Sequence, residues 1–178
     1  MTGSAKEYGK ALYELARDER LLEDMHEELK DIDALLKESP EFIKLLSSRA
    51  IERTERIRVV DETFGGRAHP YTVSFMKLLV EKERIDCLPD CVKLFHQRYL
   101  DDLGIVEAHV VSAVPLTPND EEALRQKLER LSNKKVAMIT KIDPSIIGGV
   151  SVEIDGRRYD NTIQNKLGRL RQRLARSL

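Results

Sequence analysis

The sequence has no tryptophan, and aromatic residues make up only 5% of the chain. Any core must therefore be built mainly from aliphatic side chains. Hydrophobic residues account for 41% and charged residues for 34% of the chain, a balance that excludes a disordered tail. The composition instead favours a soluble, helix-rich protein with one ordinary core or two small ones.

Long apolar runs are also missing. No stretch approaches the roughly 20 residues that a membrane-spanning helix needs, so we expect any membrane association to come through another protein. The opening residues are charged and amphipathic, which is unlike a signal peptide. The chain has only two cysteines, Cys87 and Cys91, and we expect them to be reduced thiols in a cytosol-like compartment.

A strong net charge is absent, since the formal value is −1 at pH 7, and this argues against a protein that binds DNA along its whole surface. The charge is unevenly spread, however. Residues 1–40 carry six basic and eleven acidic side chains, whereas residues 157–178 carry seven basic side chains against Asp160 alone. This basic end has three interpretations: arginines near a helix C-terminus, a surface for an acidic protein partner, or a nucleic-acid site. No aromatic side chain lies among the arginines after Tyr159, which disfavours nucleic acid.

Recognisable catalytic and metal-binding motifs are missing too. Cys87, Cys91 and His96 are close in sequence, but a structural zinc needs four ligands, and a fourth would have to come from far away. Gly148-Gly149 lacks the remaining residues of a phosphate loop and precedes a strand, so a backbone turn is the better interpretation. The four histidines belong to separate predicted elements. We therefore expect no catalytic residue, no metal and no cofactor.

The first 103 residues have a helical pattern throughout. Residues 5–37 predict two helices, the second with an apolar seam of Leu22, Met25, Leu29, Ile32 and Leu36. Further helices are predicted near residues 39–46, 51–63, 70–84 and 88–103, from capping and breaking residues such as Ser39-Pro40, Gly65-Gly66 and Gly104.

The pattern changes at Gly104. Strands are predicted at 105–111, 135–142, 150–154 and 157–159, with Asp155-Gly156 as a two-residue hairpin turn. Thr117-Pro118 begins a helix carried by Leu124, Leu128 and Leu131, and a last helix has the apolar stripe Ile163, Leu167, Leu170 and Leu174. The sequence thus predicts an all-α domain over residues 1–103 and a small α+β domain over residues 104–178.

Several stretches resemble one known family. They are Tyr8 to Ala16, Phe75 to Arg84, Val110 to Thr117, Ile142 to Val150 and Tyr159 to Ile163. Their order and spacing are similar to those of the delta subunits of bacterial and chloroplast F-type ATP synthases, a family that includes the mitochondrial oligomycin-sensitivity-conferring protein. The sequence departs from the usual pattern at Gly9 (Ala), Ser74 (Asn), Glu83 (Gly) and Thr162 (Ser), where the family's frequent residue is given in parentheses.

The resemblance implies a non-catalytic stator subunit that links the alpha/beta catalytic head to the peripheral stalk, at the cytoplasmic face of the cell membrane. It implies a six-helix N-terminal bundle that holds the N-terminal helix of an alpha subunit in a groove between its first and fifth helices. The implied groove residues are Tyr8, Ala11, Leu12, Leu15, Ser74, Lys77, Leu78 and Glu81. The C-terminal domain would hold the stalk b subunits, with Arg169, Arg173 and Arg176 as candidate contacts.

Taken from the residues alone, the stripe on the first helix has another interpretation. Tyr8, Ala11, Leu12 and Leu15 share one helix face, and apolar faces usually belong to a core. A nucleic-acid-binding module that uses the arginine-rich end is the alternative function.

Overall fold

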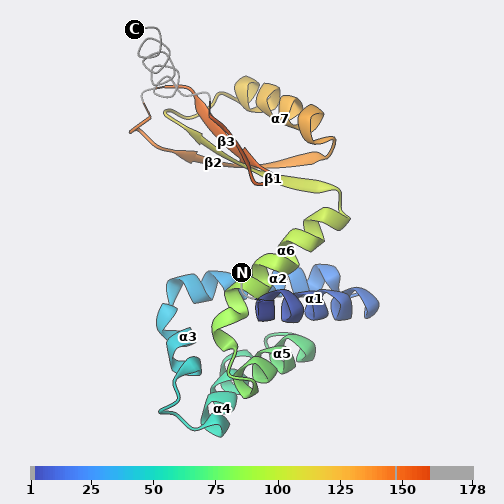
Figure 1. Ribbon diagram of the computed structural model, residues 1–178, viewed down its shortest axis with the longest axis vertical. Coiled ribbons are helices and arrows are strands. Elements are labelled where there is room, and N and C mark those ends of the chain that lie inside the picture. Colours follow the sequence, from blue (N-terminus) through green and yellow to red (C-terminus); the bar gives the residue numbers. More distant parts are fainter. Residues whose placement is uncertain (1–2, 147, 161–178) are drawn as a thin grey trace, which may run out of the picture. The chain divides into compact units, whose positions relative to one another are not determined.

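The computed structural model describes residues 3–146 and 148–160, and it divides into two compact units between Tyr99 and Leu100 (Figure 1). The first unit is helical and the second contains a four-stranded sheet. The predicted fold class is confirmed at that level, with a helical N-terminal part and an α+β C-terminal part. The domain boundary expected at Gly104 lies just beyond the division.

The described part of the first unit consists of helices joined by short turns (Figure 1). Their bounds are α1 (Gly3–Asp18), α2 (Leu22–Glu38), α3 (Pro40–Ser47), α4 (Arg53–Phe64), α5 (Pro70–Glu81), a 3₁₀ turn η1 (Ile85–Cys87) and α6 (Leu88–Asp102). The predicted helices all form, and η1 is an addition that the sequence pattern did not reveal.

A single aliphatic core holds these helices together. The predicted seam of α2 is buried at Met25, Leu29, Ile32 and Leu36, and α5 buries Phe75, Met76, Leu79 and Val80 as expected. Each such side chain contributes about 1.5–3 kcal/mol when it is fully removed from water. The core thus fixes which sides of α2 and α5 remain at the surface.

Helices α1 and α6 approach each other closely at Gly9. A Cβ atom at this position would lie 2.9 Å from Leu94 Cδ2 and 3.2 Å from both Cα and the carbonyl oxygen of Cys91. Glycine inside a helix costs about 1 kcal/mol relative to alanine. The close approach gives that glycine a packing role, because a larger residue would push α1 away from the backbone of α6.

Two helices end in Schellman motifs whose left-handed residue is not glycine. After α5, Glu83 has φ of 53°, its amide bonds to the carbonyl of Val80, and the amide of Arg84 bonds to that of Leu79. After α1, Arg20 plays the same part with φ of 61°. Glycine is favoured at this position because it lacks a Cβ.

The helix starts follow the predicted signals with two differences. The side chain of His69 caps α5 by accepting a hydrogen bond from the amide of Tyr71, and that of Thr117 caps α7 (Pro118–Ser132) by accepting one from Asp120. The Asp120 carboxylate accepts a hydrogen bond from the Thr117 hydroxyl, and not from the backbone amide of Thr117. Ser39 stands at the start of α3 but makes no side-chain cap.

The second unit packs α7 on one face of a mixed sheet (Figure 1). The strands are β1 (Ile105–Ser112), β2 (Lys135–Ile142), β3 (Val150–Ile154) and β4 (Arg157–Asp160), in the spatial order β2-β1-β3-β4. Strands β1 and β2 are parallel because α7 connects them, while β3 is antiparallel to β1 and β4. The Asp155-Gly156 turn has positive φ at both residues, as the predicted hairpin requires.

The core of this unit lies between α7 and alternate strand residues. Val106, Ala108 and Val110 of β1 are buried, together with Leu128 of α7. Leu131 was expected on the same apolar stripe but is 64% exposed, because it lies at the end of α7 beyond the buried stretch. The predicted final helix, with Ile163 and the residues after it, lies outside the described residues.

One of the stretches that resemble the family, Ile142 to Val150, contains a turn directly after β2. The amide of Asp143 bonds to the Ser112 carbonyl, and the Asp143 carboxylate accepts the amide of Ser145 at 2.9 Å. Hydrogen bonds from Ser145 hold the pKa of this carboxyl below its usual range. Gly148 and Gly149 both have positive φ directly before β3, which agrees with the predicted backbone turn.

We expect Gly9→Leu to lower the free energy of unfolding by about 2 kcal/mol, because overpacking against Cys91 and Leu94 outweighs the better helix propensity of leucine. Urea denaturation followed by circular dichroism measures this change. The matched control is Glu7→Leu, an exposed position on the same helix, which should stay within about 0.5 kcal/mol of the parent. Equal urea midpoints for the two variants would show that the close contact between α1 and α6 at Gly9 does not limit the size of the residue there.

Candidate partner-binding surfaces

The stripe predicted on α1 lies at the edge of the buried face of the helix. Ala11 is exposed, Leu15 is 37% exposed and Tyr8 is partly buried. Leu12 is only 2% exposed and belongs to the core, which corrects the expectation that it lies at a surface groove. The buried face runs through Ala5, Gly9, Leu12, Tyr13 and Ala16, so the four stripe residues divide between core and surface.

The residues proposed on α5 all lie on the side away from the core. Ser74 and Glu81 are exposed, Leu78 is 37% exposed, and Lys77 is partly buried. Lys77 forms an ion pair with Asp61 of α4, so its ammonium group already has a partner. The surface of α5 therefore offers one leucine among polar groups, one of which is neutralised within the chain.

Each stripe leaves a patch at the surface of the helical unit. Helix α5 packs chiefly against α4, whereas α1 packs against α2 and touches α6 at Gly9. Within residues 3–146 and 148–160, no hydrogen bond or ion pair joins the α1 stripe to the α5 stripe. What the two patches share is a solvent-exposed leucine, Leu15 and Leu78 respectively.

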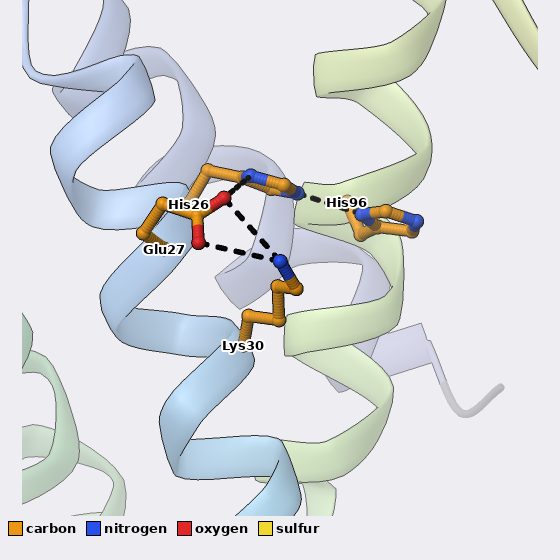
Figure 2. A network of polar contacts seen from close by, with 4 residues as sticks. All are labelled: His26, Glu27, Lys30 and His96. Carbon is orange, nitrogen blue, oxygen red and sulfur yellow. Dashed lines mark hydrogen bonds and ion pairs between the residues drawn. The ribbon is translucent and has the colours of Figure 1, made fainter.

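A pair of histidines missed by the sequence interpretation joins α2 to α6. His26 Nε2 lies 2.7 Å from Nδ1 of His96 (Figure 2). The His26 ring also stacks on Tyr99 with centroids 4.1 Å apart. The other nitrogen of His26 lies 3.6 Å from Glu27, which also pairs with Lys30. One nitrogen of the pair must donate and the other accept, so a doubly protonated pair would place two N–H groups face to face.

Burial and the neighbouring His96 lower the pKa of His26 from its ordinary value of 6.5. Glu27 acts in the opposite direction and Lys30 in the same direction, both with smaller effects. The only sequence signal for this contact was that His26 follows the apolar residue Met25 on the seam of α2. Because the His96 ring bonds to His26, it points toward α2 and not toward Cys87 and Cys91.

The two cysteines are free and buried at the junction of η1 and α6. Their sulfur atoms are 3.8 Å apart, and Cys91 Sγ lies 3.6 Å from the carbonyl oxygen of Ala5. Burial raises the pKa of both thiols, which keeps them protonated and unreactive. They act as small packing residues, and Cys91 does so where α6 meets α1.

The second unit has its own exposed apolar side chains. Leu131 and Tyr159 line a pocket of about 240 Å³ between the end of α7 and the β3–β4 hairpin, together with Ser132, Ile154, Asp155 and Arg157. Val114, Ile139 and Ile142 are also exposed. The candidate stalk contacts Arg169, Arg173 and Arg176 lie outside the described residues.

Within the described ranges, no three His, Cys, Asp or Glu side chains are grouped as a metal site would require. None of the described helices is long and apolar enough to cross a membrane.

Comparison with known proteins gives consistent matches. A family model described as ATP synthase delta (OSCP) subunit matches residues 5–174. The ATP synthase subunit delta of Carboxydothermus hydrogenoformans is 32% identical over 168 residues, which cover 94% of each chain. The protein of the same name from a Geobacillus species is 32% identical over 171 residues, which cover 96% of each chain. That of Prochlorococcus marinus is 30% identical and covers 92% of this chain and 91% of its own.

A solved structure has a similar fold. A chain of the Toxoplasma gondii mitochondrial ATP synthase hexamer, determined by cryo-electron microscopy, superposes with a TM-score of 0.71 over 98% of each chain. The sequence identity is 20%, so this similarity concerns the fold alone.

We expect the free energy of unfolding to fall as the pH drops below about 6.5, the unfolded-state pKa of His26. A histidine whose pKa is lowered in the folded state stabilises the fold at pH values above its unfolded-state pKa. This contribution is lost as the pH falls through its folded-state pKa. Urea denaturation between pH 5 and pH 8 measures the trend. His26→Gln should flatten it, whereas His109→Gln, at an exposed position of β1, should not. An unchanged slope in His26→Gln would contradict the assignment.

Proposed function

The chain belongs to the ATP synthase delta (OSCP) subunit family, and on this premise we propose that it is a non-catalytic stator subunit. It links the alpha/beta catalytic head to the peripheral stalk, so that proton-driven rotation of the rotor is coupled to ATP synthesis. Its task is to bind two partners at once and to resist torque. The observation that carries this proposal is the near full-length family match of a chain with two separately cored units.

We propose that the helical unit binds the N-terminal helix of an alpha subunit. Helices α1 to α6 would act as one six-helix bundle over residues 1–103, and the contacts would come from Tyr8, Ala11 and Leu15 of α1 and from Ser74, Lys77, Leu78 and Glu81 of α5. An amphipathic helix placed on such a surface buries apolar side chains at spacings of three and four residues. Ala11 supports this mode because its small, exposed side chain lets another helix backbone approach closely.

The α+β unit, residues 104–178, would bind the b subunits of the peripheral stalk. The supporting observation is the basic sequence that ends the chain, which includes Arg169, Arg173 and Arg176. An acidic protein surface would complement this charge. The comparisons give the nucleic-acid alternative no support, since the relatives named above are ATP synthase subunits.

As part of the complex, the protein would be peripheral to the cytoplasmic face of the cell membrane. Its membrane association would come through the other subunits. No cofactor and no bond-making chemistry enter this role, because a stator contributes binding free energy and stiffness.

We expect Ala11→Asp to weaken binding of a synthetic alpha-subunit N-terminal peptide by at least roughly tenfold, because the contact would bury an unpaired carboxylate. The melting temperature should barely change, since Ala11 is exposed in the free protein. Isothermal titration calorimetry gives the affinity. Ala34→Asp, at an exposed position of α2, is the matched control and should bind like the parent. Full affinity in Ala11→Asp would reject the α1 surface as the alpha-binding site.

The combined reversal of Arg169, Arg173 and Arg176 to Glu should weaken binding of the stalk b subunits while the protein stays folded, because the proposed contact is between opposite charges. Co-purification with b subunits at low salt measures the binding, and circular dichroism checks the fold. The control reverses Arg125, Lys127 and Arg130 of α7, which changes the net charge equally. If both triple variants keep the parent affinity at low salt, the basic end is only a solvated surface.

A further inference from the structure

The start of α5 is held by a carboxylate from a different helix. Glu28 of α2 accepts two hydrogen bonds there: Oε1 accepts the amide of His69 at 2.9 Å, and Oε2 accepts the hydroxyl of Thr72 at 2.9 Å. Thr72 is completely buried. The two bonded residues stand at the N-cap and at the third position of α5.

The local sequence explains why a distant carboxylate is suited to this place. The first amides of a helix lack partners within the helix, and a side chain at the N-cap usually supplies one. Here the His69 ring accepts the Tyr71 amide at 3.3 Å, and Pro70 has no amide hydrogen. The amide of His69 is another of these groups, and Glu28 accepts it. A negative charge at this end is also favourable with the helix dipole.

Two oxygens of one carboxylate hold two residues of α5 that are three positions apart. A single bond would fix only the distance between α2 and α5, whereas two bonds also restrict rotation of α5 about its axis. Rotation matters because each residue is offset by about 100° from the next around a helix of 3.6 residues per turn. A modest turn would move Leu78 toward or away from the surface.

The other polar contacts of α5 are more exposed. Lys77 pairs with Asp61 of α4, and Glu83, just after α5, pairs with Arg49 at 3.0 Å with both side chains at least half exposed. Exposed ion pairs restrict geometry weakly, because water and salt compete for the charges. The Glu28 contact differs in reaching a fully buried hydroxyl and a backbone amide.

We propose that Glu28 is a positioning residue for the partner-binding surface of α5. It sets the rotation of the helix, and thereby the presentation of Ser74 and Leu78, without touching the partner itself. This inference rests on the proposed binding of an alpha-subunit helix to that surface.

The test compares the full-length chain with Glu28→Gln, which replaces one of the two acceptor oxygens by an NH2 group, and with Thr72→Val, which removes the hydroxyl donor. The probe is a synthetic peptide of the alpha-subunit N-terminus, titrated by calorimetry well below the melting temperature, where every variant is folded by circular dichroism. We expect each variant to raise Kd roughly fivefold, about the effect of one net hydrogen bond, and the His69 amide to exchange faster with deuterium. Glu27→Gln, the same change at the exposed neighbouring position, should leave both unchanged.

The outcomes separate this inference from the proposed function. If the parent binds and both variants bind equally well, Glu28 does not position the surface, and the proposed function stands. If the parent does not bind the peptide, the proposed function fails and the inference fails with it. If only Glu28→Gln loses affinity while Thr72→Val does not, the two-point contact is wrong, because the charge alone would account for the effect.

Discussion

The close approach of α1 to α6 at Gly9 determines which side of α1 remains available for a partner. The missing Cβ lets the backbone of Cys91 come near, and the ring of Tyr13 then packs edge-on against Phe95 with centroids 5.3 Å apart. With that side committed to the core, Ala11 and Leu15 are left exposed. The surface that α1 offers to a partner is therefore set by Gly9, which lies on the opposite side of the helix and does not itself need to touch the partner.

Most of the fold was predictable because its signals are local. Helix starts such as Thr117-Pro118, breakers such as Gly65 and the Asp155-Gly156 turn each act over a few residues, and their helices and strands formed where expected. The missed features depend on distant neighbours. Nothing near His26 indicates that His96 will meet it, and nothing near Glu28 indicates that it will cap a helix more than forty residues away.

The candidate site was less predictable than the fold for a related reason. A helical stripe such as Tyr8, Ala11, Leu12 and Leu15 defines one side of a helix, but the width and centre of the buried face depend on the helices packed around it. The burial of Gly9 and Tyr13 shifts the buried face so that Leu12 falls inside it and Leu15 at its edge. On α5 the exposed side was easier to predict, because six buried positions leave little choice for it.

The two proposed contacts rest on different physical interactions, and this would suit the proposed stator role, in which two partners are held under load. The surface of the helical unit offers Leu15, Leu78 and the small Ala11, while the charge of Lys77 is already neutralised by Asp61. Binding there would depend mainly on burial of apolar area, which salt affects little. The basic end of the chain would instead attract its partner through charge, and screening by salt weakens such attraction. A rise in ionic strength would then weaken the stalk contact and leave the head contact in place, because only the stalk contact depends on opposite charges.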